Sequence, residues 1–312
     1  MLERTGRKLV KPPDRTVPGY TFLSTPKSPN FRPHSFVGFF TDGNKTKFVI
    51  KKYNYTRKNL DYEYLSNERS MLQLVNTLEF PRNGIGAPKL IASHNSGGQV
   101  IIQTEFAQGH TIDTLPKHKI IETLSLVIRH LRKLSGRLTA SQLAGLPKRT
   151  PFLTFATLPA YTIRAYMKEH SLGKSFVYSL YVFYKYYFPI LFGRYTLGLS
   201  HRDLHPDNVL YNSHTRTLTY LDLECMVIAD ELYDLALIPR LFARYLTAED
   251  YIQLVKRQNL SKSETHRLIA LILDGCIIKI ATEQKNSRDY KDAIAGFTTA
   301  IREIIPGFRQ SI

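Results

Sequence analysis

The chain has 312 residues, a net charge of +17 at neutral pH and 43% hydrophobic residues. This length suffices for one large domain or two modest ones, and the hydrophobic content is enough for ordinary cores, so the composition excludes a disordered chain. Two cysteines, Cys225 and Cys276, stand in apolar surroundings without metal-ligand spacing. They favour buried reduced thiols over a disulfide, and hence a cytoplasmic location.

The positive charge is uneven along the chain. It gathers in residues 1–60 and in residues 136–200, where Glu169 is the only acidic residue. Two explanations fit this pattern equally well. In the first, the Lys and Arg side chains keep the protein soluble. In the second, they attract an anionic substrate, a membrane surface or a nucleic acid. The charge alone leaves these explanations open.

The predicted elements begin after residues 1–34, a basic and proline-rich arm with little expected regular structure. Runs of β-branched and aromatic residues around turns predict antiparallel strands at residues 35–40, 47–53, 88–92 and 99–104. Apolar residues at helical spacing predict helices at residues 61–78, 116–135, 152–170, 174–192, 238–246, 248–258, 263–283 and 290–305, with Ser261 and Ser263 as candidate caps.

Residues 174–192 are rich in aromatic side chains, which raises the question of a membrane span. Lys185 and Pro189 interrupt the segment, and a span needs about twenty predominantly apolar residues. A core helix is therefore the favoured interpretation. A peripheral aromatic and basic contact with an anionic membrane, at the inner membrane surface, stays as the alternative.

The residues that indicate a chemical reaction lie in one polar segment and a short segment that follows it. Residues 201–208 read His-Arg-Asp-Leu-His-Pro-Asp-Asn, and Asp222 and Glu224 follow a predicted hairpin of residues 209–211 and 217–221. The hairpin would bring Asp203, Asn208 and Asp222 to the same end of two short strands. Phosphoryl transfer to an alcohol needs one carboxylate to accept the hydroxyl proton and oxygen ligands for Mg²⁺. The alternative is a polar hairpin whose buried carboxylates cap turns.

The pattern His-x-Asp-(x)4-Asn followed by Asp-x-Glu resembles the catalytic centre of the kinase-like phosphotransferases, the group of aminoglycoside phosphotransferase and choline kinase. The resemblance implies that Asp203 is the catalytic base, and that Asn208 and Asp222 bind the metal. Glu224 stands where the group often carries a second acid. It also implies that ATP and Mg²⁺ are used.

The implied fold is α+β and protein-kinase-like, with two lobes. A small antiparallel-sheet lobe at residues 35–108 would bind the nucleotide. A larger, mainly helical lobe at residues 109–312 would carry catalysis and acceptor binding, with a helical substrate region at about residues 136–199.

The resemblance also marks nucleotide-binding residues in the small lobe. Lys51 resembles the strand lysine that contacts the phosphates, with Lys52 as its competitor, because side chains alternate along a strand. Glu68 would pair with that lysine, with Glu63 as its competitor. Backbone groups of the hinge would hydrogen-bond the adenine, and the hinge residues are Glu105, Phe106 and Ala107.

The acceptor is predicted to be a small hydroxyl-bearing molecule. The chain lacks the Ala-Pro-Glu element of protein kinases and has Asp234-Leu235-Ala236, which resembles an element of the small-molecule kinases. The basic residues before the catalytic loop, among them Lys148, Arg149, Arg164, Lys168 and Lys174, favour a neutral or anionic acceptor over an aminoglycoside. Candidate substrate contacts are Arg202, His205 and Asp234.

Other functions stay open at this stage. A kinase of a membrane glycolipid or lipopolysaccharide core sugar would account for the basic and aromatic regions. A protein kinase and a non-catalytic nucleotide- or RNA-binding module are less favoured, since the base-and-metal set is complete, and nucleic acid is not the expected partner. The oligomeric state is left undetermined.

Overall fold

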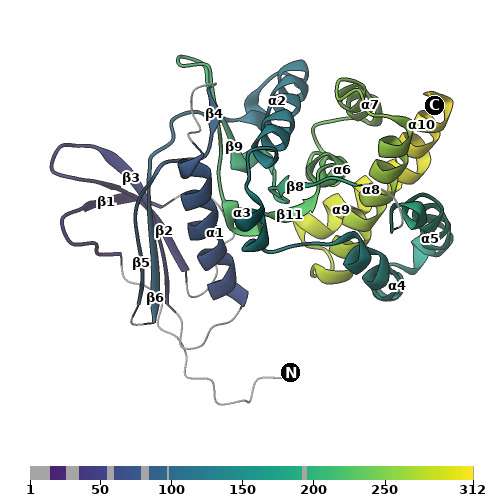
Figure 1. Cartoon of the computed structure of the whole chain (residues 1–312), viewed down its shortest axis with the longest axis horizontal. Coiled ribbons are helices and arrows are strands. Elements are labelled where there is room, and N and C mark those ends of the chain that lie inside the picture. The colour runs from purple at the N-terminus through teal and green to yellow at the C-terminus, as the bar shows by residue number, and fades with distance from the viewer. Residues whose placement is uncertain are drawn as a thin grey trace. The chain divides into compact units, whose positions relative to one another are not determined.

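The computed structural model describes residues 15–25, 35–54, 60–78, 84–96, 98–191 and 195–311. The chain forms two compact units (Figure 1). The small unit comprises Met1–Gly109 together with Leu221–Cys225, and the large unit comprises His110–Tyr220 together with Met226–Ile312. Residues 109–312 were expected in a single lobe, so the grouping of the five residues Leu221–Cys225 with the small unit is a difference from the sequence prediction.

The small unit is built on a five-stranded sheet of order β1-β2-β3-β6-β5, in which every neighbouring pair is antiparallel. Its strands are β1 (Thr21–Ser24), β2 (Ser35–Thr41), β3 (Lys47–Asn54), β5 (Leu90–Ser96) and β6 (Gln99–Glu105). The four strands predicted from the sequence are confirmed. Phe36, Phe40 and Ile50 form a buried apolar cluster on this sheet, which is the alternation expected of a half-buried strand surface.

One strand of this five-stranded sheet was not predicted. β1 lies within the arm at residues 1–34, where little regular structure was expected, and it pairs with β2 through Thr21 and Thr41. Phe22 packs against Phe36 and Phe40, and this aromatic packing stabilises the short segment as a strand. The other residues of the arm, 1–14 and 26–34, lie outside the described part of the chain.

A single long helix, α1 (Leu60–Thr77), accompanies the sheet and matches the predicted helix at residues 61–78 (Figure 1). Met71, Leu72 and Val75 of α1 are buried. The short strand β4 (Ile85–Gly86) follows. The one-turn helix η5 (Leu223–Cys225) packs against α1.

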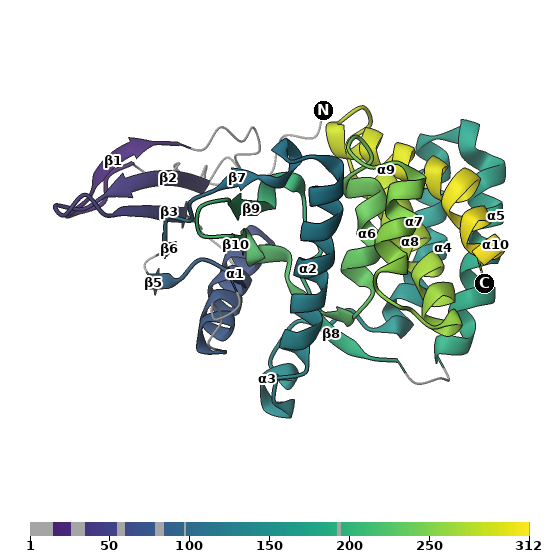
Figure 2. The same cartoon turned by 90° about the horizontal axis from the view of Figure 1, so that it is seen from above.

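The large unit is mainly helical (Figure 2). Its helices are α2 (Lys117–Ser135), α3 (Ala140–Ala144), α4 (Pro151–Lys168), α5 (Gly173–Tyr187), α6 (Tyr233–Leu241), α7 (Ala248–Lys256), α8 (Lys262–Thr282), α9 (Arg288–Thr299) and α10 (Ile305–Ser311). The buried helix α8 packs against α4, α5, α6 and α9. Ser261 caps α8 through a capping box with Glu264, so Ser261 and not Ser263 is the cap.

Short strands carry the polar stretch. The predicted hairpin is confirmed as β9 (Val209–Asn212) and β10 (Thr217–Tyr220), in which Val209 pairs with Tyr220. β7 (His110–Thr111) pairs with β9. β8 (Leu197–Ser200) and β11 (Val227–Asp230) form a separate antiparallel pair. β8 therefore leads directly into His201.

Several predicted helix ends are corrected. The predicted helix at residues 174–192 is α5 followed by a 3-10 turn, Phe188–Leu191, and Phe192 lies outside the described residues. The last predicted helix, at residues 290–305, is α9, a π-helical turn at Ala300–Ile304 and then α10. None of the helices in the described ranges is long and apolar enough to cross a membrane.

Two helices contain an internal proline, and a tyrosine hydroxyl compensates each one. Pro239 in α6 cannot donate to the carbonyl of Leu235, and the buried Tyr251 hydroxyl donates to that carbonyl at 3.1 Å. Pro159 in α4 likewise cannot donate to the carbonyl of Phe155, and the Tyr184 hydroxyl donates to that carbonyl at 3.3 Å instead. With this compensation, α6 continues through Pro239. The helix begins at Tyr233, five residues before the start predicted from the sequence.

Two residue assignments also change. Arg149 was counted among the basic residues that favour a neutral or anionic acceptor, but its guanidinium pairs with the buried Asp274 at 3.0 Å, and Asp274 also accepts from the Tyr233 hydroxyl at 3.2 Å. Arg149 is therefore a structural residue. Neither cysteine forms a disulfide, and only Cys276 is buried, whereas Cys225 is half-buried.

The compensation of Pro239 gives a stability prediction. Tyr251→Phe leaves the Leu235 carbonyl buried without its donor, which we expect to lower the free energy of unfolding by about 1–3 kcal/mol. In a Pro239→Ala background the new amide can bond that carbonyl, so the same substitution should cost less. Urea denaturation of the four proteins measures this, with Tyr184→Phe, at a part-buried site, as a milder comparison. An equal cost in both backgrounds would contradict the explanation.

Candidate active site

A lysine between two carboxylates forms the centre of the polar site in the small unit. The Nζ atom of Lys51 lies 2.7 Å from Oε1 of Glu68 and 2.8 Å from Oδ1 of Asp222. Burial lowers the pKa of Lys51, but the charges and hydrogen bonds of Asp222 and Glu68 outweigh it, so the pKa is raised and the lysine stays charged. Strand β3, helix α1 and the segment after β10 each contribute one of these side chains.

The alternatives left open by the sequence are decided by this geometry. Because neighbouring side chains alternate along β3, Lys52 points to the opposite face, where its Nζ atom donates to the carbonyl of Thr16. Glu68 is buried beneath Lys51, whereas Glu63 is exposed. Lys51 and Glu68 are thus the pair that the structure brings together.

Asp222 and Glu224 lie beside this pair. One carboxylate oxygen from each of Glu68, Asp222 and Glu224 lies within 4.8 Å of the other two. Asn67 of α1 donates to the Glu224 carbonyl at 2.9 Å and so fixes this segment. Asp222 has a φ of 62°, an uncommon conformation for a residue other than glycine that the neighbouring contacts maintain. These hard oxygen ligands fit Mg²⁺, although Glu68 is already neutralised by Lys51.

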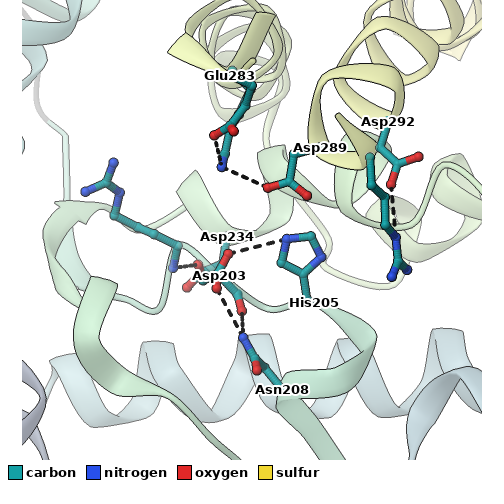
Figure 3. Close-up of polar contacts among 10 residues, drawn as sticks. Asp203, His205, Asn208, Asp234, Glu283, Asp289 and Asp292 are labelled. Atoms are coloured by element: carbon teal, nitrogen blue, oxygen red, sulfur yellow. Dashed lines mark hydrogen bonds and ion pairs between the residues drawn. The ribbon is translucent and has the colours of Figure 1, made fainter. Parts of the chain in front are cut away.

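The large unit holds Asp203 in the loop after β8. The Asn208 amide nitrogen donates to the Asp203 carbonyl at 2.8 Å and to its Oδ2 atom at 3.2 Å (Figure 3). This orientation turns the Asn208 amide oxygen, the atom that would bind a metal, away from Asp203. The Asp203 side chain keeps 27% of its surface exposed, so a substrate hydroxyl can reach the carboxylate.

Asp234 organises the same loop from beneath. Its carboxylate accepts from the amide nitrogens of His201 at 2.8 Å and Arg202 at 2.7 Å, and from the Ser200 hydroxyl at 3.0 Å. Burial raises the pKa of Asp234, while these hydrogen bonds favour its charged form. Asp234 is almost fully buried, so we correct its predicted substrate contact to a positioning role.

Arg202 has an uncommon backbone conformation, with a φ of 65°. Its guanidinium lies 5.7 Å from the centre of the Tyr233 ring, a cation–π arrangement. The hydrogen bond from its amide to Asp234 maintains this backbone conformation, which turns the chain immediately before Asp203.

His205 lies beside the Asp203 carboxylate. Its Nε2 atom is 3.5 Å from Oδ1 of Asp203. Burial lowers the pKa of His205, as do the charges of Arg240 and Lys279, while Asp203 and Asp289 act in the opposite direction. The imidazole is therefore mainly neutral at pH 7 and can take part in hydrogen bonding to an acceptor.

Charged residues from the junction of α8 and α9 lie near His205. No motif in the sequence points to them, because they are more than seventy positions away along the chain. Lys279 bridges Glu283 at 2.8 Å and Asp289 at 3.3 Å, and Asp292 pairs with Arg244 at 2.8 Å (Figure 3). Asp289 is close enough to His205 for each to shift the pKa of the other. The acceptor side of the loop is thus rich in paired charges.

The predicted hinge connects the sheet of the small unit to the segment that follows it. The Glu105 amide donates to the Lys89 carbonyl at 3.0 Å, and the Phe106 amide donates to the Lys47 carbonyl at 3.3 Å. These bonds occupy the two amides, so Ala107 is the hinge residue whose amide best suits adenine recognition. The role of the hinge stays a prediction.

The predicted site residues fall into two sets. Lys51, Glu68, Asp222 and Glu224 meet within the small unit, and Arg202, Asp203, His205, Asn208 and Asp234 meet within the large unit. The expectation that the hairpin brings Asp222 to Asp203 and Asn208 stays a prediction, because these residues belong to different units.

Comparison with known structures shows the fold. Aminoglycoside phosphotransferase APH(4)-Ia matches with a TM-score of 0.63 and 15% identity, over 91% of this chain and 93% of that one. Its complex with AMP-PNP and hygromycin B, in a thermostable mutant, gives 0.61 and 15%, over 92% and 94%. The GDP and kanamycin complex of APH(2″)-IIIa gives 0.61 and 16%, over 93% and 95%. The predicted kinase-like fold is confirmed.

Comparison with curated proteins found no match. The family model described as the phosphotransferase enzyme family matches residues 34–268, which is well over half of the 312 residues. This range includes every candidate site residue of both units. The chain therefore belongs to the phosphotransferase enzyme family.

Proposed function

We propose that this phosphotransferase moves the γ-phosphate of ATP, with Mg²⁺, to a hydroxyl group of a small molecule that is neutral or anionic. The observation that carries the proposal is the Lys51 ammonium held between Glu68 and Asp222. A charged lysine fixed in this way is suited to hold nucleotide phosphates, because its position is set before the nucleotide arrives.

The choice of ATP rests on the similar structures only in part. One was solved with AMP-PNP and another with GDP, so both adenine and guanine nucleotides occur among proteins of this fold. In the proposal, the backbone at Glu105, Phe106 and Ala107 binds the base, and Lys51 contacts the phosphates. Competition between ATP and GTP decides the nucleotide directly.

Mg²⁺ would be held by Asp222, with Glu224 beside it and the Asn208 amide oxygen as a further ligand. When bound, the ion supplies charge neutralisation on the phosphates during transfer. Asp222 accepts from Lys51 through Oδ1, and one of its carboxylate oxygens lies within 4.8 Å of a carboxylate oxygen of Glu224. The donor set of carboxylates and an amide is the one that Mg²⁺ prefers.

Asp203 would act as the base. Its carboxylate is held by Asn208 and by the loop that Asp234 fixes, so it is oriented before the acceptor binds. It would accept the proton of the acceptor hydroxyl as the oxygen attacks the γ-phosphorus. His205, mainly neutral, would hydrogen-bond the same acceptor.

The acceptor class is inferred from the charges near His205. Glu283, Asp289 and Asp292 each pair with a Lys or Arg of the chain itself, namely Lys279 or Arg244. A polycationic acceptor would have to compete with these cations for the carboxylates, and it would also meet Arg240 and Lys279. A neutral or anionic hydroxyl compound would neither compete with these cations for the carboxylates nor be repelled by Arg240 and Lys279.

A membrane-held acceptor, such as a glycolipid or lipopolysaccharide core sugar, is the second candidate. The observation that favours it is the exposed apolar surface of α4 and α5 in the unit that carries Asp203. In addition, the Lys168 ammonium at the end of α4 donates to the carbonyl of Glu283, so this surface connects directly to the charged junction near His205.

The first experiment measures Mg²⁺-dependent ADP release with pools of alcohols, sugars, nucleosides, glycolipids and aminoglycosides. We expect one non-aminoglycoside pool to stimulate release, and Asp203→Asn to lower that turnover by roughly 10³-fold, because the base is lost. Nucleotide binding should persist. The matched control is Asp207→Asn, an exposed carboxylate four residues further along the chain. Unchanged turnover in Asp203→Asn would remove Asp203 from this role.

A second prediction concerns the lysine. Lys51→Met should weaken nucleotide binding by about tenfold or more, because a charged donor to phosphate is lost and Glu68 is left without its cation. Lys52→Met, whose ammonium bonds Thr16, should leave nucleotide affinity unchanged. Titration calorimetry with ATP and Mg²⁺ measures both. The reverse order of effects would assign the phosphate contact to Lys52.

A third prediction tests the positioning role of Asp234. Asp234→Asn weakens the hydrogen bonds to the loop, so kcat should fall by roughly ten- to a hundredfold while nucleotide affinity is retained. Asp230→Asn is the matched control, since Asp230 is equally buried but bonds Leu232 and Arg267 instead of the loop. If both variants lose the same kcat relative to their folded fraction, the effect is general and the assignment is wrong.

A further inference from the structure

The exposed apolar side chains of the large unit are concentrated on two helices. Of the eleven large hydrophobic residues that are strongly exposed in the described ranges, eight lie between residues 152 and 188, on α4, α5 and the turn that follows. Single exposed apolar residues are normal on a protein surface, but a contiguous group marks an interaction site. This group of exposed apolar side chains therefore indicates an interaction surface.

Helix α4 has the reverse of the usual surface pattern. Its inner face, which includes Thr154, Leu158, Thr162 and Ala165, is buried, and α4 packs against α8. Its outer face, at spacings of three and four residues, is entirely apolar and exposed: Phe152, Ala156, Ala160, Ile163 and Met167. A surface helix normally turns charged and polar residues to water.

Helix α5 continues this surface. Val177 and Tyr181 are 71% and 61% exposed, and Lys174 and Lys185 are exposed on the same side at helical spacing. The Lys185 ammonium lies 5.9 Å from the centre of the Tyr181 ring, so the cation and the aromatic ring share one face.

The two stripes are joined. Phe155 of α4 contacts Tyr184 and Phe188 with ring centres 4.8 and 6.0 Å apart. Both helices pack on α8, and both views of the large unit show them side by side at its outer edge (Figures 1 and 2). We call the exposed side chains Phe152, Ile163, Met167, Val177, Tyr181 and Phe188 the α4–α5 face.

The charge around this face indicates the kind of partner. Residues 136–200 contain one acidic residue, Glu169, whose carboxylate already accepts from Ser171 and Tyr290. Arg164, Lys174 and Lys185 are exposed around the face. The complementary partner is therefore anionic at its surface and apolar just beneath, which describes a lipid bilayer with anionic headgroups and not a nucleic acid.

We propose that the α4–α5 face docks on a membrane surface containing anionic lipid. The apolar side chains enter the boundary between headgroups and acyl chains, with both helices parallel to the surface. The lysine ammoniums reach the lipid phosphates, and Tyr181 occupies the interface. The proposal does not depend on the identity of the acceptor, since binding to lipid can be measured without phosphoryl transfer.

The test is co-sedimentation of the full chain with vesicles of phosphatidylcholine alone or with phosphatidylglycerol. We expect binding to the mixed vesicles, weakened by added salt. The triple variant Ile163→Gln, Met167→Gln, Val177→Gln should bind roughly tenfold more weakly, because apolar insertion is lost. Lys174→Gln with Lys185→Gln should bind about 25-fold more weakly, since each lost charge weakens binding about fivefold.

Matched controls carry the same substitutions elsewhere. Leu23→Gln with Ile91→Gln removes exposed apolar side chains, and Lys133→Gln with Lys256→Gln removes exposed cations, so both should bind like the unaltered chain. Absence of vesicle binding, or equal binding by the triple variant, would overturn the proposal. So would self-association in sedimentation velocity that the triple variant abolishes, which would assign the face to a second copy of the chain.

Discussion

The ion pairs of Lys51 are the constraint on which the candidate site depends. They join a strand, a helix and the segment Leu221–Cys225, so one side chain fixes three parts of the small unit. Lys51 is partly buried and would be costly without its two carboxylates, and Glu68 would be costly without Lys51. This mutual dependence places Asp222, with its uncommon backbone conformation, among hard oxygen ligands. The cation proposed to contact the phosphates and the carboxylate proposed to bind the metal therefore come from the same local network.

In the large unit, a different kind of contact fixes the loop that carries the candidate site residues. There a buried carboxylate, Asp234, accepts backbone hydrogen bonds and holds the loop that presents Asp203. Rigid support beneath a partly exposed carboxylate suits the base role proposed for Asp203. Lys279 lies between Glu283 and Asp289 and offsets part of their negative charge from within the chain. A polycation bound there would have to compete with this ammonium for both carboxylates.

The α4–α5 face adds a surface that neither network explains. An exposed apolar stripe on the outer side of α4 is the opposite of what folding alone would select for a helix in water. The face belongs to the unit that holds Asp203, and Lys168 connects the end of α4 with the carbonyl of Glu283. If the face rests on lipid, an acceptor at the membrane surface is brought near the enzyme without any change in the catalytic residues. Such localisation raises the effective concentration of the acceptor.

The sequence by itself determined four of the five strands of the small-unit sheet, the hairpin, most helices and the polar motif at residues 201–208, because these depend on local periodicity and on residue spacing within short segments. It could not choose between Lys51 and Lys52, and it did not show that Arg149 pairs with Asp274 or that Asp234 supports the loop before Asp203. Those outcomes depend on contacts with residues distant in the chain. Only the tertiary structure decided which lysine faces Glu68, which proline is compensated by Tyr251, and which carboxylates lie near His205. Burial and long-range pairing, which no local pattern encodes, are the physical reason.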